Sequence, residues 1–189
     1  MQGGNKMIYI CSDFHFNHEN ILKYEPETRP FETVEEMNET LIKNWNSVVT
    51  CEDTVYVLGD FFMGKIDKIP EILNRLNRKE IILIPGNHDT KNRLAAYKEF
   101  GITVKDSLLD HIRYKGLNFM LCHFPIENQE LFNMMTVNNG ECILLYGHIH
   151  SNAPKGFYKN TYHIGVDTNN LTPVSAEQIW KESYPEALS

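Results

Sequence analysis

Residues 80–89 read EIILIPGNHD, and this stretch decides the predicted fold. It begins as a continuous apolar run, passes through a Pro-Gly turn and ends on the polar side chains of Asn87, His88 and Asp89. Apolar runs of roughly four to eight residues that end at turn residues are typical of strands buried on both faces. The stretch therefore predicts a buried strand whose carboxyl end carries chemically active side chains.

Four further segments share this design, because each is a short apolar run that ends on a residue able to bind a metal. They are residues 7–13 (MIYICSD), 54–60 (TVYVLGD), 117–123 (LNFMLCH) and 142–148 (CILLYGH). His15 and His150 each follow such an end at a distance of two residues. Because the loops at the carboxyl ends of strands in an open α/β sheet converge on one crevice, we expect these polar ends to meet.

Helical patterns alternate with the strands in the first half of the chain. Residues 33–49 place apolar side chains three or four residues apart, and Thr33 followed by Glu36 forms a capping box at the start. Further helices are expected over residues 66–77, 91–100 and 175–183, the second of them ended by Gly101. The alternation predicts a layered α/β domain.

The second half of the chain has a different pattern. Residues 102–122 and 142–166 are expected to form consecutive strands joined by Lys-Gly turns at 115–116 and 155–156. This pattern predicts a second, more antiparallel sheet packed on the first. The helix over residues 175–183 is expected to close an outer layer.

Length and composition limit the class of protein. With 189 residues, of which 42% are hydrophobic and 23% charged, the chain fits a single domain over residues 7–189 behind a disordered tail at residues 1–6. A formal net charge of -7 argues against a broad nucleic-acid-binding surface, so duplex DNA is an unlikely partner. The sequence leaves the oligomeric state open.

The four cysteines and the lengths of the apolar runs bear on where in the cell the protein is expected. The cysteines lie far apart without a C-x-x-C spacing, and three lie within apolar runs, which favours free thiols in a reducing environment. The first residues lack a signal pattern, and no apolar run approaches the roughly 18 residues that a membrane span needs. We therefore expect a cytoplasmic protein without a membrane segment.

Seven of the strand-end residues form a mixed set of nitrogen and oxygen donors. The set consists of Asp13, His15, Asp60, Asn87, His123, His148 and His150. Imidazole, carboxylate and amide donors suit divalent first-row metals and differ from the thiolates of a structural zinc site.

The order D-x-H, G-D, G-N-H-D, H and G-H-x-H over residues 13–150 resembles the pattern of the calcineurin-like metallophosphoesterase family, in its small bacterial and phage members. The resemblance implies an α/β fold, a four-layered α/β/β/α sandwich of two mixed sheets. It also implies a first metal ion held by Asp13, His15, Asp60 and His150, and a second held by Asp60, Asn87, His123 and His148. His88 would face the substrate, with Asp89 as its orienting partner.

The resemblance further implies a metal-dependent phosphoric ester hydrolase. Two divalent ions, Mn²⁺ or Fe²⁺/Fe³⁺ with Zn²⁺ or Ni²⁺ as alternatives, would hold a bridging hydroxide that attacks a phosphomonoester or phosphodiester, with His88 as general acid. Nucleotides and cyclic nucleotides are candidate substrates. The alternative is a catalytically weak metal-binding scaffold on the same fold that recruits a protein partner. Because every motif position is filled, we favour the enzyme.

Other polar residues near the motifs are candidates for substrate binding. Asn17 and His18 follow the first ligand pair, and His18 could equally cap the helix that begins there. Arg29 could contact a phosphate or lie on the surface. No role can be assigned from the sequence to His163 or Asp167.

Overall fold

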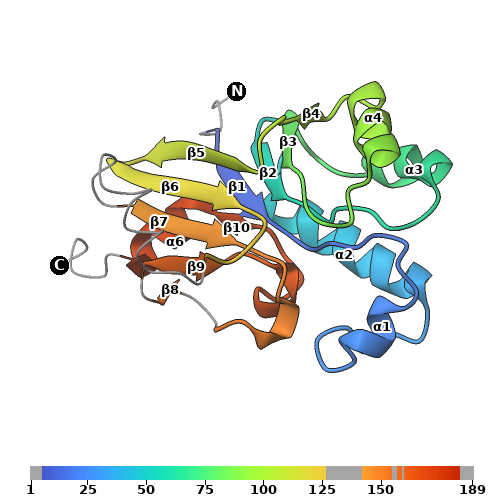
Figure 1. Cartoon of the computed structure of the whole chain (residues 1–189). Helices are drawn as coiled ribbons and strands as arrows, with labels where there is room; N and C mark the ends of the chain where they lie inside the picture. The colour runs from blue at the N-terminus through green and yellow to red at the C-terminus, as the bar shows by residue number, and fades with distance from the viewer. Residues whose placement is uncertain (1–5, 127–141, 155–156, 159, 184–189) are drawn as a thin grey trace.

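The computed structural model describes residues 6–126, 142–154, 157–158 and 160–183 (Figure 1). Two five-stranded sheets face each other, and helices cover the outer face of the first sheet (Figure 1). Both sheets are mixed, which confirms the predicted α/β fold of two mixed sheets. Residues 1–5 of the predicted disordered tail lie outside the described residues.

The first sheet contains the three strands that the first three apolar runs predicted. Its order is β10 (Val174–Ser175), β1 (Ile8–Cys11), β2 (Thr54–Leu58), β3 (Glu80–Ile84) and β4 (Thr103–Val104). The strands β1 to β4 are parallel, and only β10 is antiparallel to its neighbour. The carboxyl ends of β1, β2 and β3 therefore lie at the same edge.

The helices between these strands pack on one face of the first sheet. They are α1 (Ile21–Tyr24), α2 (Val34–Val48), the 3-10 turn η1 (Ile66–Lys68), α3 (Ile69–Leu73) and α4 (Lys91–Glu99). The apolar sides of α2, α3 and α4 share a buried core with the outer face of the sheet. The predicted helices over 33–49 and 91–100 are confirmed, and Gly101 follows the second with a φ of 86°.

The predicted helix over residues 66–77 is shorter than expected. It is divided into η1 and α3, with Pro70 in the first turn of α3. After α3, the N–H groups of Arg75 and Leu76 bond to carbonyls three residues back. This tighter 3-10 spacing ends the helix before residue 77.

The start of α2 supports a stability prediction. Thr33 Oγ1 accepts a hydrogen bond from the N–H of Glu36 at 3.2 Å, and the Glu36 carboxylate accepts one from the N–H of Glu32 at 3.1 Å. Thr33→Ala should therefore lower the free energy of unfolding by about 1 kcal/mol in urea denaturation. The control Ser47→Ala, on the exposed face of the same helix, should change it by less than about 0.5 kcal/mol. Equal effects of the two substitutions would contradict the capping role.

The second sheet contains the two remaining apolar runs. Its order is β5 (Leu109–Tyr114), β6 (Leu117–Cys122), β7 (Cys142–Tyr146), β9 (Thr161–His163) and β8 (Phe157–Tyr158). The β5–β6 and β8–β9 pairs are antiparallel, so this sheet is the more antiparallel of the two, as predicted. Lys115 and Gly116, both with positive φ, form the predicted hairpin turn. The predicted turn at 155–156 lies outside the described residues.

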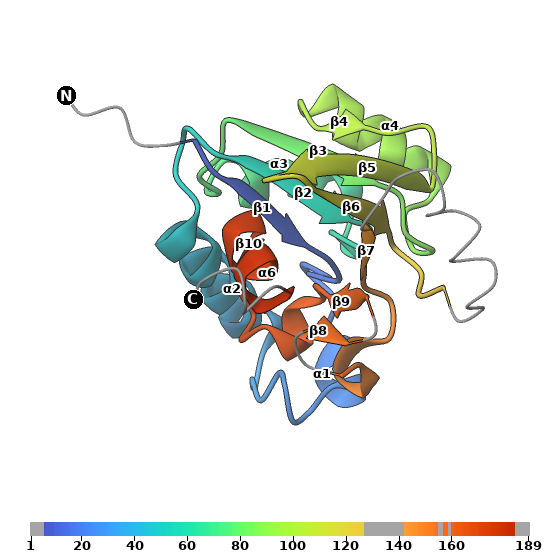
Figure 2. The same cartoon turned by 90° about the vertical axis from the view of Figure 1, so that its left-hand side faces the viewer.

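The last helix, α6 (Ala176–Ser183), forms where predicted, but it packs differently. Ser175 Oγ accepts from the N–H of Gln178, as the capping pattern predicted. Ala176 and Ile179 lie in the core shared by the two sheets, and α6 lies beside β10 (Figure 2). The predicted outer position is therefore wrong. Because β10 is only two residues long, this edge of the first sheet leaves apolar surface of the second sheet for α6 to cover.

The cysteines and the lengths of the helices can be compared with the sequence-based expectations. All four cysteines are free thiols; Cys11, Cys122 and Cys142 are buried, and Cys51 is exposed. Within the described part of the chain, none of the helices has the length and apolar character that a membrane crossing requires.

Candidate metal centre

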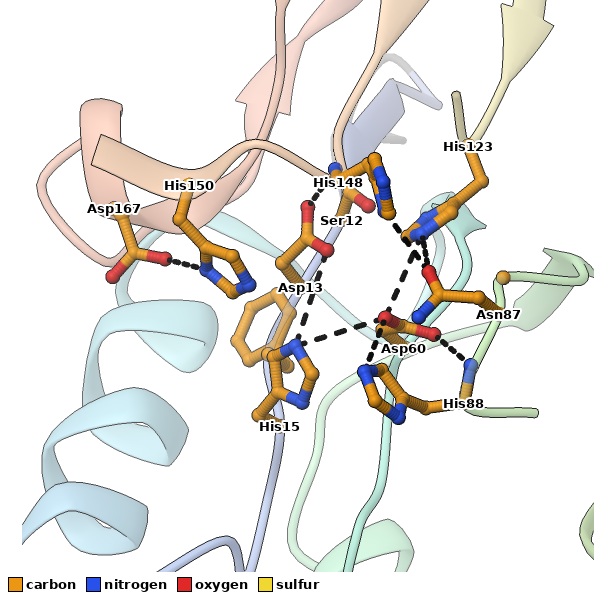
Figure 3. A network of polar contacts seen from close by, with 12 residues as sticks. Ser12, Asp13, His15, Asp60, Asn87, His88, His123, His148, His150 and Asp167 are labelled. Carbon is orange, nitrogen blue, oxygen red and sulfur yellow. Dashed lines mark hydrogen bonds and ion pairs between the residues drawn. The ribbon is translucent and has the colours of Figure 1, made fainter. Parts of the chain in front are cut away.

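Five strands, three from the first sheet and two from the second, bring the predicted metal ligands together. The strands β1, β2 and β3 of the first sheet and β6 and β7 of the second each end near one site, where their ligand side chains point toward one another (Figure 3). The site contains all seven predicted ligands: Asp13, His15, Asp60, Asn87, His123, His148 and His150. The carboxyl-end geometry that the sequence suggested therefore forms in the folded chain.

We call Asp13, His15 and His150 the first ligand group. One donor atom of each lies within 4.8 Å of the donor atoms of the other two. His15 Nε2 is 4.0 Å from Asp13 Oδ1 and 3.8 Å from Asp60 Oδ2. These donors surround a space in which one ion could be bound.

We call Asn87, His123 and His148 the second ligand group. Asn87 Oδ1 lies 2.8 Å from His123 Nε2 and 2.9 Å from His148 Nδ1. His123 Nε2 is also 3.5 Å from Asp60 Oδ2. The same oxygen of Asp60 therefore lies within reach of both ligand groups, as a bridging ligand requires.

Most of these ligands have an uncommon backbone conformation. Positive φ angles occur at Asp13 (59°), His15 (49°), Asp60 (52°), His148 (74°) and His150 (47°). Asp and His tolerate this left-handed region better than most residues, but it still costs about 1 kcal/mol or more per residue. Such strain concentrates at functional sites, where the rest of the fold maintains it.

Each of the two carboxylates uses one oxygen for a backbone hydrogen bond and turns the other toward the histidines of the site. Asp13 Oδ2 accepts from the N–H of His148 at 2.9 Å, and Asp60 Oδ1 accepts from the N–H of His88 at 2.9 Å. The N–H of His15 in turn donates to the carbonyl of Asp60 at 3.0 Å. These bonds join the strand-end loops and direct Asp13 Oδ1 and Asp60 Oδ2 into the site.

Two of the imidazoles are oriented in the same way. His123 Nδ1 lies 2.7 Å from the carbonyl oxygen of Leu58, so it must donate its proton there. His150 Nδ1 lies 2.7 Å from Asp167 Oδ2 (Figure 3). In the neutral form of each ring the lone pair is then on Nε2, the nitrogen that faces the site, which is the arrangement of a metal-bound histidine.

Unpartnered buried atoms test whether these residues fit metal ions. Within the described part of the chain, Asp13 Oδ1 and both ring nitrogens of His15 are buried without a hydrogen-bond partner. Burial raises the pKa of Asp13, while burial and the neighbouring charge of His150 hold the pKa of His15 well below its usual value. A buried carboxylate and a neutral imidazole are both stabilised by a divalent cation. The residues therefore fit a metal centre.

Asp89 does not orient His88, which corrects the prediction made from the resemblance. The buried Asp89 carboxylate accepts hydrogen bonds from the N–H groups of Asp60 at 3.0 Å and Gly86 at 2.9 Å, and from the Tyr97 hydroxyl at 3.4 Å. The chain turns back after Gly86, so Asp89 reaches beneath the loops that follow β2 and β3. The Asp89 carboxylate therefore links these two loops by hydrogen bonds to their backbone.

His88 lies beside both ligand groups without belonging to either. Its side chain is 46% exposed, and Nε2 is 3.9 Å from Asp60 Oδ2. Arg93 in α4 donates to the carbonyl of His88 at 2.5 Å, a contact that the sequence did not indicate. The backbone of His88 is therefore held by α4, and its ring lies at the exposed side of the site next to Asp60.

Asn17 and His18 lie next to the first ligand group. Asn38 donates from its side-chain amide to Asn17 Oδ1, so Asn17 is joined to α2. The His18 ring is 5.3 Å from the His15 ring, and its Nδ1 has no partner among the described residues. The side chain of His18 makes no capping bond to α1, so substrate contact remains the open alternative for this residue.

Arg29 is neither on the surface nor free to bind phosphate, contrary to both alternatives considered for it. Its side chain is fully buried, with two hydrogen bonds to Asp167 and others to the carbonyls of Asp13 and Phe14 and to Met37 Sδ. These contacts use all five guanidinium N–H groups. No donor is left for a substrate.

His163 is the last residue of β9, and Asp167 lies in the loop that follows this strand. Burial alone would raise the pKa of Asp167, but hydrogen bonds from His150 and Arg29 outweigh it and lower this pKa strongly. His163 is buried, and burial lowers its pKa to about 4. Its Nδ1 lies 2.7 Å from Thr168 Oγ1, so it contributes to the loop and not to either ligand group.

The chain matches one family model and two proteins of similar length. The family model described as calcineurin-like phosphoesterase matches residues 6–187. An uncharacterized protein of Methanocaldococcus jannaschii is 39% identical over 186 residues, covering 93% of this chain and 90% of that protein. The Gene 66 protein of Mycobacterium phage L5 is 27% identical, covering 84% of this chain and 86% of its own length.

A solved structure has the same fold. A protein of unknown function from Aquifex aeolicus superposes with a TM-score of 0.76 at 28% sequence identity, and the match covers 94% of this chain and 99% of that one. Two mixed sheets with carboxylates and histidines at converging strand ends define a class of metal-dependent α/β proteins. Within that class, the chain belongs to the calcineurin-like phosphoesterase family.

Proposed function

We propose that the protein hydrolyses phosphomonoesters or phosphodiesters at a centre of two divalent cations. The observation that carries this proposal is the position of Asp60 Oδ2, 3.8 Å from His15 Nε2 and 3.5 Å from His123 Nε2. One carboxylate oxygen thus lies between two groups of ligands. The first cation would be held by Asp13, His15, Asp60 and His150, and the second by Asp60, Asn87, His123 and His148.

The donors of the protein set the charge of this centre. When bound, two divalent cations would activate a water molecule and neutralise negative charge on a phosphoryl group. Asp13 and Asp60 are the only carboxylates in the two ligand sets, so two negative charges would face four positive ones. The centre would remain positive enough to attract a phosphate ester, although the whole chain has a formal charge of -7.

His88 is the candidate general acid. Its half-exposed ring lies at the open side of the site, 3.9 Å from Asp60, where a leaving-group oxygen could be reached. An imidazolium can donate a proton to that oxygen near neutral pH. His18, whose ring lies 5.3 Å from that of His15, is a candidate contact for the remaining part of the substrate.

A metal analysis combined with an assay panel tests the proposal. The protein, purified without chelators, should contain two divalent ions, with Mn²⁺ or iron expected and Zn²⁺ or Ni²⁺ as alternatives. With added Mn²⁺ it should hydrolyse at least one of bis-p-nitrophenyl phosphate, p-nitrophenyl phosphate and a cyclic nucleotide, and EDTA should abolish this activity. Metal binding without turnover of any panel member would favour the scaffold alternative.

A substitution of His88 tests the role of the general acid. His88→Ala should lower kcat at least about tenfold, because a proton donor at the leaving group is lost and such a donor typically contributes about 10²–10⁴-fold. Metal content should stay near that of the wild type, since His88 belongs to neither ligand group. His111→Ala, on an exposed strand position of β5, is the control and should leave kcat unchanged. Unchanged turnover in His88→Ala would exclude the proposed role.

A further inference from the structure

The first ligand group is connected to a buried ion pair that no motif includes. Arg29 Nε lies 2.8 Å from Asp167 Oδ1, and Arg29 Nη2 lies 3.0 Å from Asp167 Oδ2. Both side chains are fully buried, and 138 residues separate them in the chain. We call them the Arg29–Asp167 pair.

One end of the pair contacts His150. Asp167 Oδ2 lies 2.7 Å from His150 Nδ1 (Figure 3). Thr28 Oγ1 donates to Asp167 Oδ1 at 2.9 Å. Arg29 donates to both oxygens of this carboxylate, and Oδ2 is placed to accept the Nδ1 proton of His150. The lone pair of His150 is then on Nε2, next to Asp13 and His15.

The other end of the pair contacts the loop after β1. Arg29 Nη2 donates to the carbonyl of Asp13 at 2.6 Å, and Nη1 donates to the carbonyl of Phe14 at 2.8 Å. This loop carries Asp13 and His15 in the left-handed conformation. The ion pair therefore connects His150, which follows a strand of the second sheet, with the loop of the first sheet that carries Asp13 and His15.

The second ligand group has different supports. His123 donates to the carbonyl of Leu58, and the Asn87 amide oxygen lies between His123 and His148. Among the described residues, neither Arg29 nor Asp167 makes a hydrogen bond to any member of that group. The pair is therefore attached to one half of the centre only.

We propose that the Arg29–Asp167 pair positions the first ligand group and raises its affinity for a divalent cation, while leaving the affinity of the second ligand group unchanged. The proposal rests on the two-cation centre proposed above. Removal of an outer partner of a metal-bound histidine typically weakens metal binding 10–100-fold. A pair with a purely structural role would instead change the stability of the fold without a difference between the two ions.

The test is a calorimetric titration of chelator-treated protein with Mn²⁺. The wild type should bind two ions. In Asp167→Asn, one ion should bind about 10–100-fold more weakly, and the affinity of the other should change less than about twofold. Asp53→Asn is the control, because Asp53 is also a buried, hydrogen-bonded carboxylate, but its partners are the N–H groups of Met7 and Thr50 at the other end of β2. It should leave both affinities unchanged.

Two results of this titration would overturn the proposal: unchanged binding of both ions in Asp167→Asn, or equal weakening of both. Failure of the wild type to bind two ions would instead contradict the two-cation centre. A second measurement uses the wild-type protein and so does not depend on whether a variant folds. In metal-free wild-type protein at alkaline pH, ¹⁵N NMR should find the proton of His150 on Nδ1, and a proton on Nε2 would overturn the role given to Asp167 even if Asp167→Asn is unfolded.

Discussion

Replacing Asp60 with asparagine should remove nearly all activity, with an expected fall in kcat of about 1,000-fold or more. Asp60 Oδ1 accepts the N–H of His88, so an asparagine would keep its carbonyl oxygen there and place its NH₂ group where Oδ2 was. An amide NH₂ has no lone pair for a metal ion. Loss of a shared ligand should cost several kcal/mol of transition-state stabilisation, and about 4 kcal/mol corresponds to this factor.

The same substitution should not unfold the protein. Asn tolerates the φ of 52° found at residue 60 as well as Asp does. The charge of Asp60 also opposes ionisation of the buried Asp13, so the metal-free variant should be at least as stable as the metal-free wild type. Assays, metal analysis and thermal melts of Asp60→Asn should be compared with Asp106→Asn, whose carboxylate is 96% exposed. Wild-type kcat, or two tightly bound ions, in Asp60→Asn would exclude the bridging role.

The strands and the ligand positions could be predicted because both depend on local sequence. An apolar run that ends in a turn becomes a buried strand largely by itself, and parallel strands bring their carboxyl ends to one edge. His123 and His148 could therefore be placed near Asp60 without knowledge of any contact between them. The resemblance to a family added the partition of the ligands, which the distances from Asp60 Oδ2 now support.

The contacts that support the ligands could not be predicted in this way. Arg29 is paired with a carboxylate 138 residues away, and a single sequence contains no signal that connects the two positions. Asp89 follows His88 directly, yet its carboxylate turns to the backbone of Asp60 and Gly86. The two errors had the same cause. Arg29 was assigned to the surface or to a phosphate, and Asp89 to its neighbour His88, whereas both side chains bond to backbone groups far away in the sequence.

The position of α6 was wrong for a related reason. Its cap and its length follow from Ser175 and the residues after it, and both were predicted. The face on which it packs depends on how far β10 extends along β1, which is a property of the assembled sheets. Local structure was thus more predictable than the arrangement of layers.

Gly59 is a position where a single added methyl group should damage both the fold and the site. Gly59 has a φ of 79°, and a Cβ there would lie 2.5 Å from Gly86 Cα and 2.7 Å from His123 Nδ1. Gly101 has a φ of 86° but open space around the same atom. Gly101→Ala should therefore cost only the left-handed conformation, about 1–2 kcal/mol of unfolding free energy.

Gly59→Ala should cost the same left-handed strain and, in addition, a collision with backbone atoms that cannot rotate away. The unfolding free energy should fall by roughly 2–5 kcal/mol in total. In a chain of 189 residues this corresponds to a fall in Tm of roughly 5–20 °C. Since the collision includes the ring of His123, the second ligand group should also lose Mn²⁺ affinity, whereas Gly101→Ala should bind both ions normally. Thermal melts and titrations of the two variants separate these effects, and equal Tm values with equal metal binding would show that the close approach of Gly59 to Gly86 and His123 does not matter.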